Sequence, residues 1–158
     1  MIASNTDPND LARFITAQAP MIERVWAELH AGRKASHWMW FVFPQIAGLG
    51  RSETARFYAI NSRDEAAAYL AHPVLGPRLV ECTRLINAVR DATAEQILGY
   101  VDAMKFHSCM TLFATVDPGQ PDFAEALRRY FGGLPDRPTL DRIQRGSGAK
   151  CAVGEPEL

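Results

Sequence analysis

The sequence predicts an all-α fold, a compact single-domain bundle of about seven to nine short helices. Apolar residues recur at helical spacing along most of the 158 residues, and signals that begin and end helices separate these stretches. Only residues 37–45 lack helical periodicity, and we expect this aromatic segment to be irregular or extended. The length favours one domain. We expect it to span residues 10–145, between an N-terminal arm (1–9) and a flexible C-terminal tail (146–158).

The first two helices are expected between residues 10 and 32. Asn9 or Asp10 can cap a helix that runs to about Gln18. Pro20 suits the first turn of the second helix, and Gly32 suits its end. The inner face of this second helix carries apolar residues at helical spacing: Met21, Ile22, Val25, Trp26 and Leu29.

Three further helices are expected in the middle of the chain. Ser52 can begin a short one. Ser62 and Glu65 form a capping box that opens an alanine-rich helix. This helix stops at His72-Pro73, because the residue before a proline avoids helical angles. Pro77 then begins a helix with an apolar inner face: Leu79, Cys82, Ile86 and Val89.

The remaining helices are expected after residue 92. A second capping box lies between Thr93 and Gln96. Asp102 can cap a helix that runs to residue 114 or 115. Pro121 opens another helix, which Gly132 ends. Residues 139–145 suit a last short helix before the tail.

The run Trp38 to Phe43 holds two tryptophans and two phenylalanines. Both faces of an extended chain would be apolar here, so the segment is either a buried extended segment or a buried helical turn. Large aromatic side chains each bury roughly 150–250 Å². The run is therefore either the most tightly packed part of the core or the wall of a pocket.

Three stretches of the sequence resemble a known family. They are residues 37–45 followed by Gly48-Leu49-Gly50; His72-Pro73 with Leu75-Gly76 and Leu79; and Asp102, Lys105, Ser108 and residues 110–113. Over about residues 10–145 the chain thus resembles the bacterial domain-of-unknown-function family 1810, in which position 109 tends to serine rather than cysteine. The resemblance implies a mainly α-helical fold and assigns no catalytic residue. The family is sometimes mislabelled calpastatin-like, but calpain-inhibitor segments are disordered, whereas this chain has a globular composition.

Composition excludes several function classes. The three cysteines are far apart and form no Cys-x-x-Cys pair, and the four histidines lack metal-ligand spacing, so we expect no disulfide framework, no metal site and no cofactor. No run approaches the roughly 18 apolar residues of a membrane helix, and no signal peptide is recognisable. We therefore expect a cytoplasmic protein. A pI of about 6.4 makes nucleic-acid binding unfavourable.

The first candidate site lies at the aromatic run. His37 is a candidate for acid–base catalysis, because its unperturbed pKa is near ~6.5. Trp38 and Trp40 offer ring faces, and Gln45 offers an amide, which is the mixture that small-molecule pockets use. For each of them the alternative is structural: the rings build the core, His37 bonds a carbonyl and Gln45 ties down the turn after Pro44.

A polar stripe on the helix near residue 105 is the second candidate. Lys105 is the other catalytic candidate, and helical spacing places it beside Ser108, which neighbours Thr111. We expect Ser108 and Thr111 to contribute ligand contacts; the alternative is that they satisfy backbone carbonyls. Between residues 24 and 63, six basic residues face two acidic ones, a local charge of +4 that favours an anionic partner.

Two functions are compatible with these patterns. One is a binder of an anionic, phosphorylated or nucleotide-like small molecule, or an enzyme acting on one, with its pocket near the segment from His37 to Gln45. The other is a non-catalytic protein-interaction module in which the aromatic segment is purely core. The sequence identifies no protein partner and does not decide whether the chain is an enzyme.

Overall fold

The computed structural model describes the backbone of residues 7–152 and the side chains of residues 7–145. Within these residues it contains ten helices and no strand, which confirms the all-α prediction. The helices are α1 (Ala12–Gln18), α2 (Ile22–His30), α3 (Met39–Val42), α4 (Glu53–Phe57), α5 (Arg63–Ala71), α6 (Leu75–Asn87), α7 (Ala94–Leu98), α8 (Tyr100–Val116), α9 (Pro121–Phe131) and α10 (Arg137–Ala152).

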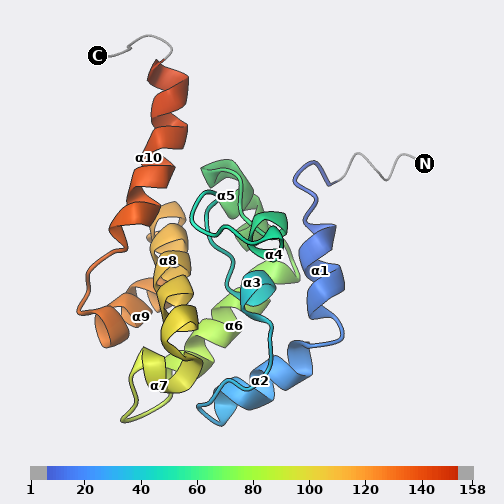
Figure 1. Ribbon diagram of the computed structural model, residues 1–158, viewed down its shortest axis with the longest axis vertical. Helices are drawn as coiled ribbons and strands as arrows, with labels where there is room; N and C mark the ends of the chain where they lie inside the picture. The colour runs from blue at the N-terminus through green and yellow to red at the C-terminus, as the bar shows by residue number, and fades with distance from the viewer. Residues whose placement is uncertain (1–6, 153–158) are drawn as a thin grey trace.

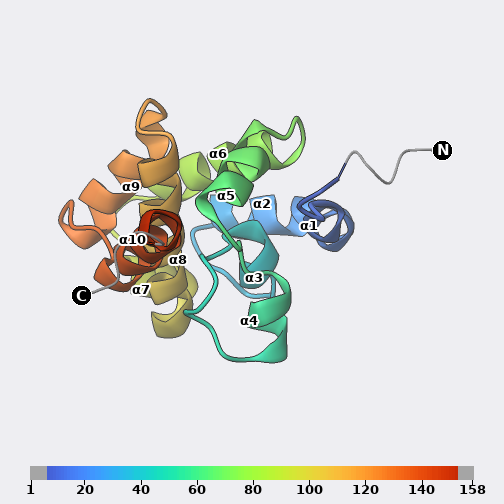
Figure 2. The same cartoon turned by 90° about the horizontal axis from the view of Figure 1, so that it is seen from above.

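Helix α8 is the organising element, because α5, α7, α9 and α10 all pack against it. Seen from above, α7–α10 occupy one side of the molecule and α1–α4 the other, with α5 and α6 between them (Figure 2). Helix α10 runs alongside α8 and continues beyond it, away from the body (Figure 1). None of the helices in the part of the chain that the structure describes is both long and apolar enough to cross a membrane.

One buried cluster of apolar side chains joins helices from both sides, with members from Leu11 to Ile143. The aromatic segment is at its centre. Phe43 packs edge to face on Phe106 of α8, with ring centroids 5.0 Å apart, and Trp38 lies 6.3 Å from Phe43. Both Trp38 and Phe43 are buried. The core alternative is therefore correct for most of the aromatic run.

The aromatic segment contains a single helical turn, α3, between irregular residues. Extended structure, the other possibility, does not occur between Met39 and Val42. The backbone N–H of Val42 donates to the carbonyl of Trp38 at 3.2 Å, and Met39, Phe41 and Val42 are all buried. Because its remaining residue, the half-buried Trp40, is also apolar, the turn has no polar face and lacks the periodicity by which a helix is recognised. This turn brings the helices in the described residues to ten.

Three helix starts have the predicted capping residue, but the first helix is capped differently and the Ser62–Glu65 capping box is incomplete. The Glu65 carboxylate accepts from the N–H of Asn61 rather than from that of Ser62. Ser52 and Ser62 accept from the backbone N–H three residues on, at 3.0 Å, and residues 93–96 form a reciprocal capping box. The expected cap of the first helix at Asn9 or Asp10 is wrong. Asp7 accepts from the N–H groups of Leu11 and Ala12 instead, because its carboxylate reaches over the intervening turn.

Several further boundaries shift. Helix α6 begins at Leu75 rather than at Pro77, which lies in its first turn, and α10 begins at Arg137 rather than at residue 139. Helix α8 begins at Tyr100 rather than at Asp102, which lies in its first turn. Helix α10 continues to Ala152, past the expected start of the tail at residue 146. Residues 1–6 of the expected arm and 153–158 of the expected tail lie outside the described residues.

Candidate functional site

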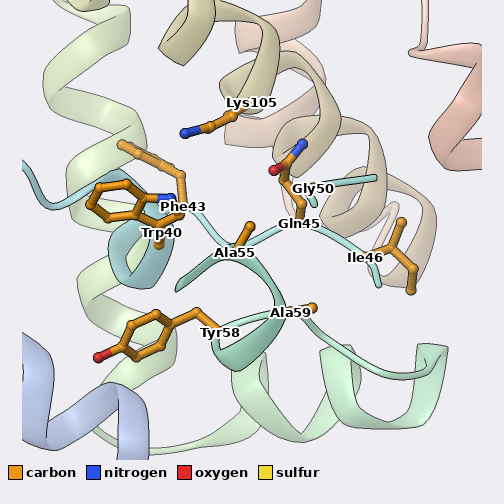
Figure 3. A pocket seen from close by; sticks show the side chains of 9 residues that line it. All are labelled: Trp40, Phe43, Gln45, Ile46, Gly50, Ala55, Tyr58, Ala59 and Lys105. Carbon is orange, nitrogen blue, oxygen red and sulfur yellow. The ribbon is translucent and has the colours of Figure 1, made fainter. Parts of the chain in front are cut away.

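A small recess lies between the aromatic segment, α4 and α8 (Figure 3). Its cavity volume is about 10 Å³, which is room for about one water molecule. Three lining residues are aromatic, four are small or aliphatic, and two carry polar side chains. They are Trp40, Phe43 and Tyr58; Gly50, Ala55, Ala59 and Ile46; and Gln45 and Lys105.

Lys105 and Trp40 form the polar and aromatic sides of this recess. The Lys105 Nζ lies 4.9 Å from the centroid of the Trp40 ring, within the range of a cation–π interaction. The Lys105 side chain is 21% exposed and lies 3.5 Å from Asp102 Oδ1. Lys105 extends toward Trp40 in Figure 3. Its ammonium is therefore oriented toward the recess but remains in contact with water.

Gln45 contributes an amide with unused hydrogen-bonding capacity. Its backbone carbonyl accepts from the N–H of Ile60 at 2.8 Å. Its side chain lines the recess and makes no hydrogen bond to protein within residues 7–145. An amide offers both a donor and an acceptor, so Gln45 can orient a bound polar group. Of the residues predicted from sequence, the structure brings together Trp40, Gln45 and Lys105.

Asp102 joins two lysines, an arrangement that was not predicted from the sequence. Lys34 Nζ lies 2.9 Å from Asp102 Oδ2 and 5.1 Å from the centroid of the Trp38 ring. The Lys34 side chain is only 8% exposed. One carboxylate thus serves two ammonium groups, and the three side chains carry a net charge of +1. The i,i+3 spacing of Asp102 and Lys105 was the available signal for their pairing; nothing local indicated Lys34.

Trp38 belongs to the core rather than to the recess. It is fully buried, and its indole N–H donates to Glu28 Oε1 at 2.9 Å. The same carboxylate accepts from the backbone N–H groups of Ala35 and Ser36 and from the Ser36 hydroxyl. Burial acts to raise the pKa of Glu28, but the hydrogen bonds from Ser36, Ala35 and Trp38 outweigh it and lower the pKa to about 2.

His37 is exposed and does not line the recess. Both of its neighbours, Ser36 and Trp38, donate to Glu28, whereas the His37 side chain is exposed. The structure therefore separates His37 from Lys105, the other catalytic candidate. Adjacency to an aromatic run does not fix the direction of a side chain that precedes a buried turn.

Ser108 and Thr111 lie on a different face of α8, where they hold the start of α10. The Ser108 hydroxyl lies 3.0 Å from Asp136 Oδ2, and the backbone N–H of Asp136 donates to Thr111 Oγ1 at 2.8 Å. Asp136 in turn accepts from the backbone N–H and the hydroxyl of Thr139, which makes it the cap of α10. Neither residue lines the recess with Lys105.

A serine, a histidine and an aspartate also meet at this junction. His107 Nδ1 is 4.0 Å from Asp136 Oδ1, and His107 Nε2 is 2.8 Å from the carbonyl of Leu134. The imidazole stacks on Phe131. A catalytic triad needs the histidine between serine and carboxylate, whereas Ser108 bonds directly to Asp136. The cluster is a helix anchor.

The described cysteines are not placed for thiolate chemistry. Cys82 and Cys109 are fully buried. Burial raises the pKa of the Cys109 thiol well above its usual range and that of Cys82 to about 12. In the described part of the chain, no group of three or more His, Cys, Asp or Glu side chains could hold a metal ion.

These features define a class of all-α proteins in which short helices surround one aromatic core beside a small polar recess. The family model described as "Protein of unknown function (DUF1810)" matches residues 8–143, and the chain belongs to this family. The chain is also similar to the conserved hypothetical protein Rv1873 from Mycobacterium tuberculosis. That crystal structure shares 51% sequence identity and a TM-score of 0.86, over 87% of this chain and 99% of the other. No curated protein matches the sequence.

Proposed function

We propose that this protein binds a small anionic molecule at the recess between Trp40, Gln45 and Lys105. The negative group would lie against the Lys105 ammonium and the Gln45 amide, and a flat part of the ligand would lie on the Trp40 ring. The observation that carries the proposal is the position of Lys105 over Trp40 in a recess that the Gln45 side chain also lines.

Charge and size narrow the ligand class. Lys105 is the only cation among the nine lining residues, and its group with Lys34 and Asp102 carries a net charge of +1. This suits one carboxylate or another singly charged group better than a polyphosphate. Small-molecule pockets usually measure roughly 300–1,000 Å³. Neither a nucleotide nor a smaller organic anion fits the recess as it stands, and a compact planar anion requires the smaller enlargement.

The lining residues favour binding over catalysis. They include no histidine, carboxylate or thiol, and the exposed His37 is not among them. General acid–base chemistry needs a titratable group within hydrogen-bond reach of the substrate. Lys105 is the lining side chain that brings such a group toward Trp40, whereas the Tyr58 hydroxyl points away from Lys105 and Gln45 (Figure 3). We therefore assign Lys105 a ligand-holding role in this proposal.

Benzoate, a planar monoanion, provides a direct test. Binding would be followed by NMR through the indole N–H signal of Trp40. We expect Lys105→Met and Gln45→Leu each to weaken benzoate binding by about 10-fold or more, because a hydrogen bond to a charged group contributes roughly 1.5–3 kcal/mol. Arg33→Met, which removes an exposed charge from outside the recess lining, is the control and should leave the affinity unchanged.

The proposal fails if a panel of planar carboxylates and inorganic phosphate leaves the Trp40 signal unmoved at millimolar concentration. Equal weakening by Arg33→Met and Lys105→Met would also contradict it, because non-specific charge attraction would then account for binding.

A second candidate function is a protein-interaction module. Three apolar side chains at the start of α8 are largely exposed: Tyr100 (69%), Val101 (62%) and Met104 (56%). Contiguous exposed apolar surface often marks an interaction site. Capture of a cellular partner by the wild-type protein, lost in Val101→Asp but retained in Lys105→Met, would favour this function over ligand binding.

A further inference from the structure

The chain forms a closed surface loop beside the recess. A parallel bridge between Ile46 and Ile60 brings its ends together. The N–H of Ala47 donates to the carbonyl of Ile60 at 2.7 Å, and the N–H of Ile60 donates to the carbonyl of Gln45 at 2.8 Å. Compact surface loops with adjacent ends are frequently functional. Here the bridge starts at Gln45, one of the ligand-binding candidates.

One end of the loop is firmly attached to the body. Arg13 donates to the carbonyls of Phe57 and Ala59, each at 2.8 Å. The Tyr58 ring packs against Phe14 and Phe41. The part of the loop without such attachment is residues 48–56, which we call the lid segment.

The lid segment borders the recess, and its apolar contact with the core is made by the partly buried Leu49. Gly50 and Ala55 supply its share of the lining, and Gly50 allows the close approach of Ala55. Helix α4, which begins in this segment, contains no buried residue. Burial of apolar surface is the main force that holds an element in place. Apart from Leu49, the lid segment is therefore held by little apolar burial, as is typical of segments that open locally.

Arg142 of α10 touches the lid segment at Gly48. A Cβ atom at position 48 would lie 2.6 Å from the Arg142 Cζ and 2.7 Å from its Nη1, so the guanidinium rests directly on the glycine. Gly48 also has a φ of 102°, which side chains rarely adopt. The cap at Asp136 and the buried Ile143 hold α10 to α8. Arg142 thus connects the lid segment to α10, which packs against the helix that carries Lys105.

We propose that residues 48–56 open about the Ile46–Ile60 bridge to admit ligand to the recess, and that Arg142 holds them closed. The inference rests on the proposed function, because a recess with room for one water needs an entrance. In the closed form Gly50 and Ala55 separate Trp40 and Lys105 from bulk water on that side. Removal of the Arg142 contact shifts the lid segment toward the open form.

Acrylamide quenching of Trp40 fluorescence measures the opening without any ligand. A Trp26→Phe background leaves Trp38, which is sealed in the core, and Trp40, so that a change in quenching reports Trp40. We expect Arg142→Ala to raise the quenching constant by about twofold or more, since local opening exposes the indole. Arg145→Ala removes an exposed arginine from the same helix and should have no effect.

Gly48→Ala is an independent second variant. Its Cβ displaces the guanidinium and strains the turn, so it should increase quenching as Arg142→Ala does. Gly133→Ala is its control, because Gly133 also has positive φ but has open space around it. Thermal unfolding of each variant distinguishes a local opening from a general loss of stability.

The lid proposal is wrong if quenching is unchanged in both the Arg142→Ala and the Gly48→Ala proteins while both remain folded. The lid proposal is also wrong if wild-type Trp40 is quenched as fast as free indole, because nothing would then cover the ring. Neither result depends on benzoate. If Arg142→Ala opens the lid segment but no planar anion binds, the lid stands and the proposed ligand class fails.

Discussion

The ammonium of Lys105 lies over the indole of Trp40, with Nζ 4.9 Å from the ring centroid. The two residues are far apart in sequence, and the packing of α3 against the core beside α8 brings them together. A parallel pair lies next to them, with Lys34 over Trp38 at 5.1 Å. Asp102 neutralises both cations in part.

The two lysines should differ in their contribution to stability. Lys105→Met should cost about 0.5–1 kcal/mol, the value of a cation–π contact at a partly exposed site. Lys34→Met should cost more, because its side chain is 8% exposed and its ion pair with Asp102 is short at 2.9 Å. Urea unfolding of both variants measures the difference, and equal costs would contradict the expected role of burial.

The two tryptophans of the aromatic segment should also differ in their contribution to stability. Trp38→Ala should lower the free energy of unfolding by roughly 3–5 kcal/mol, because the ring is fully buried. Trp40→Ala should cost clearly less, since its ring borders the recess. Denaturant titration of the two proteins tests this, and a near-normal stability of Trp38→Ala would rule out its role in the core.

Acid stability should depend on Glu28. Its pKa is lowered in the folded protein to about 2 from 4.5, so its contribution is present above pH 4.5 and is lost as the pH falls toward 2. Solvent screening limits this contribution to about 1–2 kcal/mol. Between pH 5 and pH 2 the unfolding temperature should therefore fall less steeply in Glu28→Gln than in wild type. Glu81→Gln, which changes an exposed carboxylate, is the control and should behave as wild type.

Replacing only one partner of the ion pair between Arg13 and Glu65 should strongly lower the free energy of unfolding. The paired atoms are 2.8 Å apart, and the two side chains are 7% and 4% exposed. Arg13→Met alone should destabilise by about 3–5 kcal/mol, because Glu65 is left as an unpaired buried charge. The double variant with Glu65→Gln should recover part of that loss. A double-mutant cycle in urea measures the recovery, and strictly additive losses would contradict the prediction.

The capping of α10 is open to a similar test. Asp136→Ala should cost about 1–2 kcal/mol, because α10 loses its cap and the Ser108 hydroxyl loses a partner. Trypsin should then cleave faster at Arg142 and Arg145. If cleavage accelerates equally at the distant Arg90, the whole molecule has loosened and the anchor has no local role.

Several features of this protein follow from the sequence because their causes are local. Ser52, Ser62 and the capping box at 93–96 act within one helical turn, so their residue types alone predict the helix starts. The all-α class follows from such signals and from helical periodicity. The candidate site was predictable only in part. Trp40, Gln45 and Lys105 do meet, whereas His37 points to solvent and Ser108 and Thr111 face α10.

What only the tertiary structure decided is which polar groups meet across the chain. The pairing of Lys34 with Asp102, the binding of four donors by Glu28, and the contact of Arg142 with Gly48 all join residues from separate elements. Local propensity cannot specify such contacts, because they depend on how amphipathic helices share one core. The sequence by itself therefore determined that the chain is helical and where most helices begin. The packing of those helices decided that Lys105, and not His37, faces the recess.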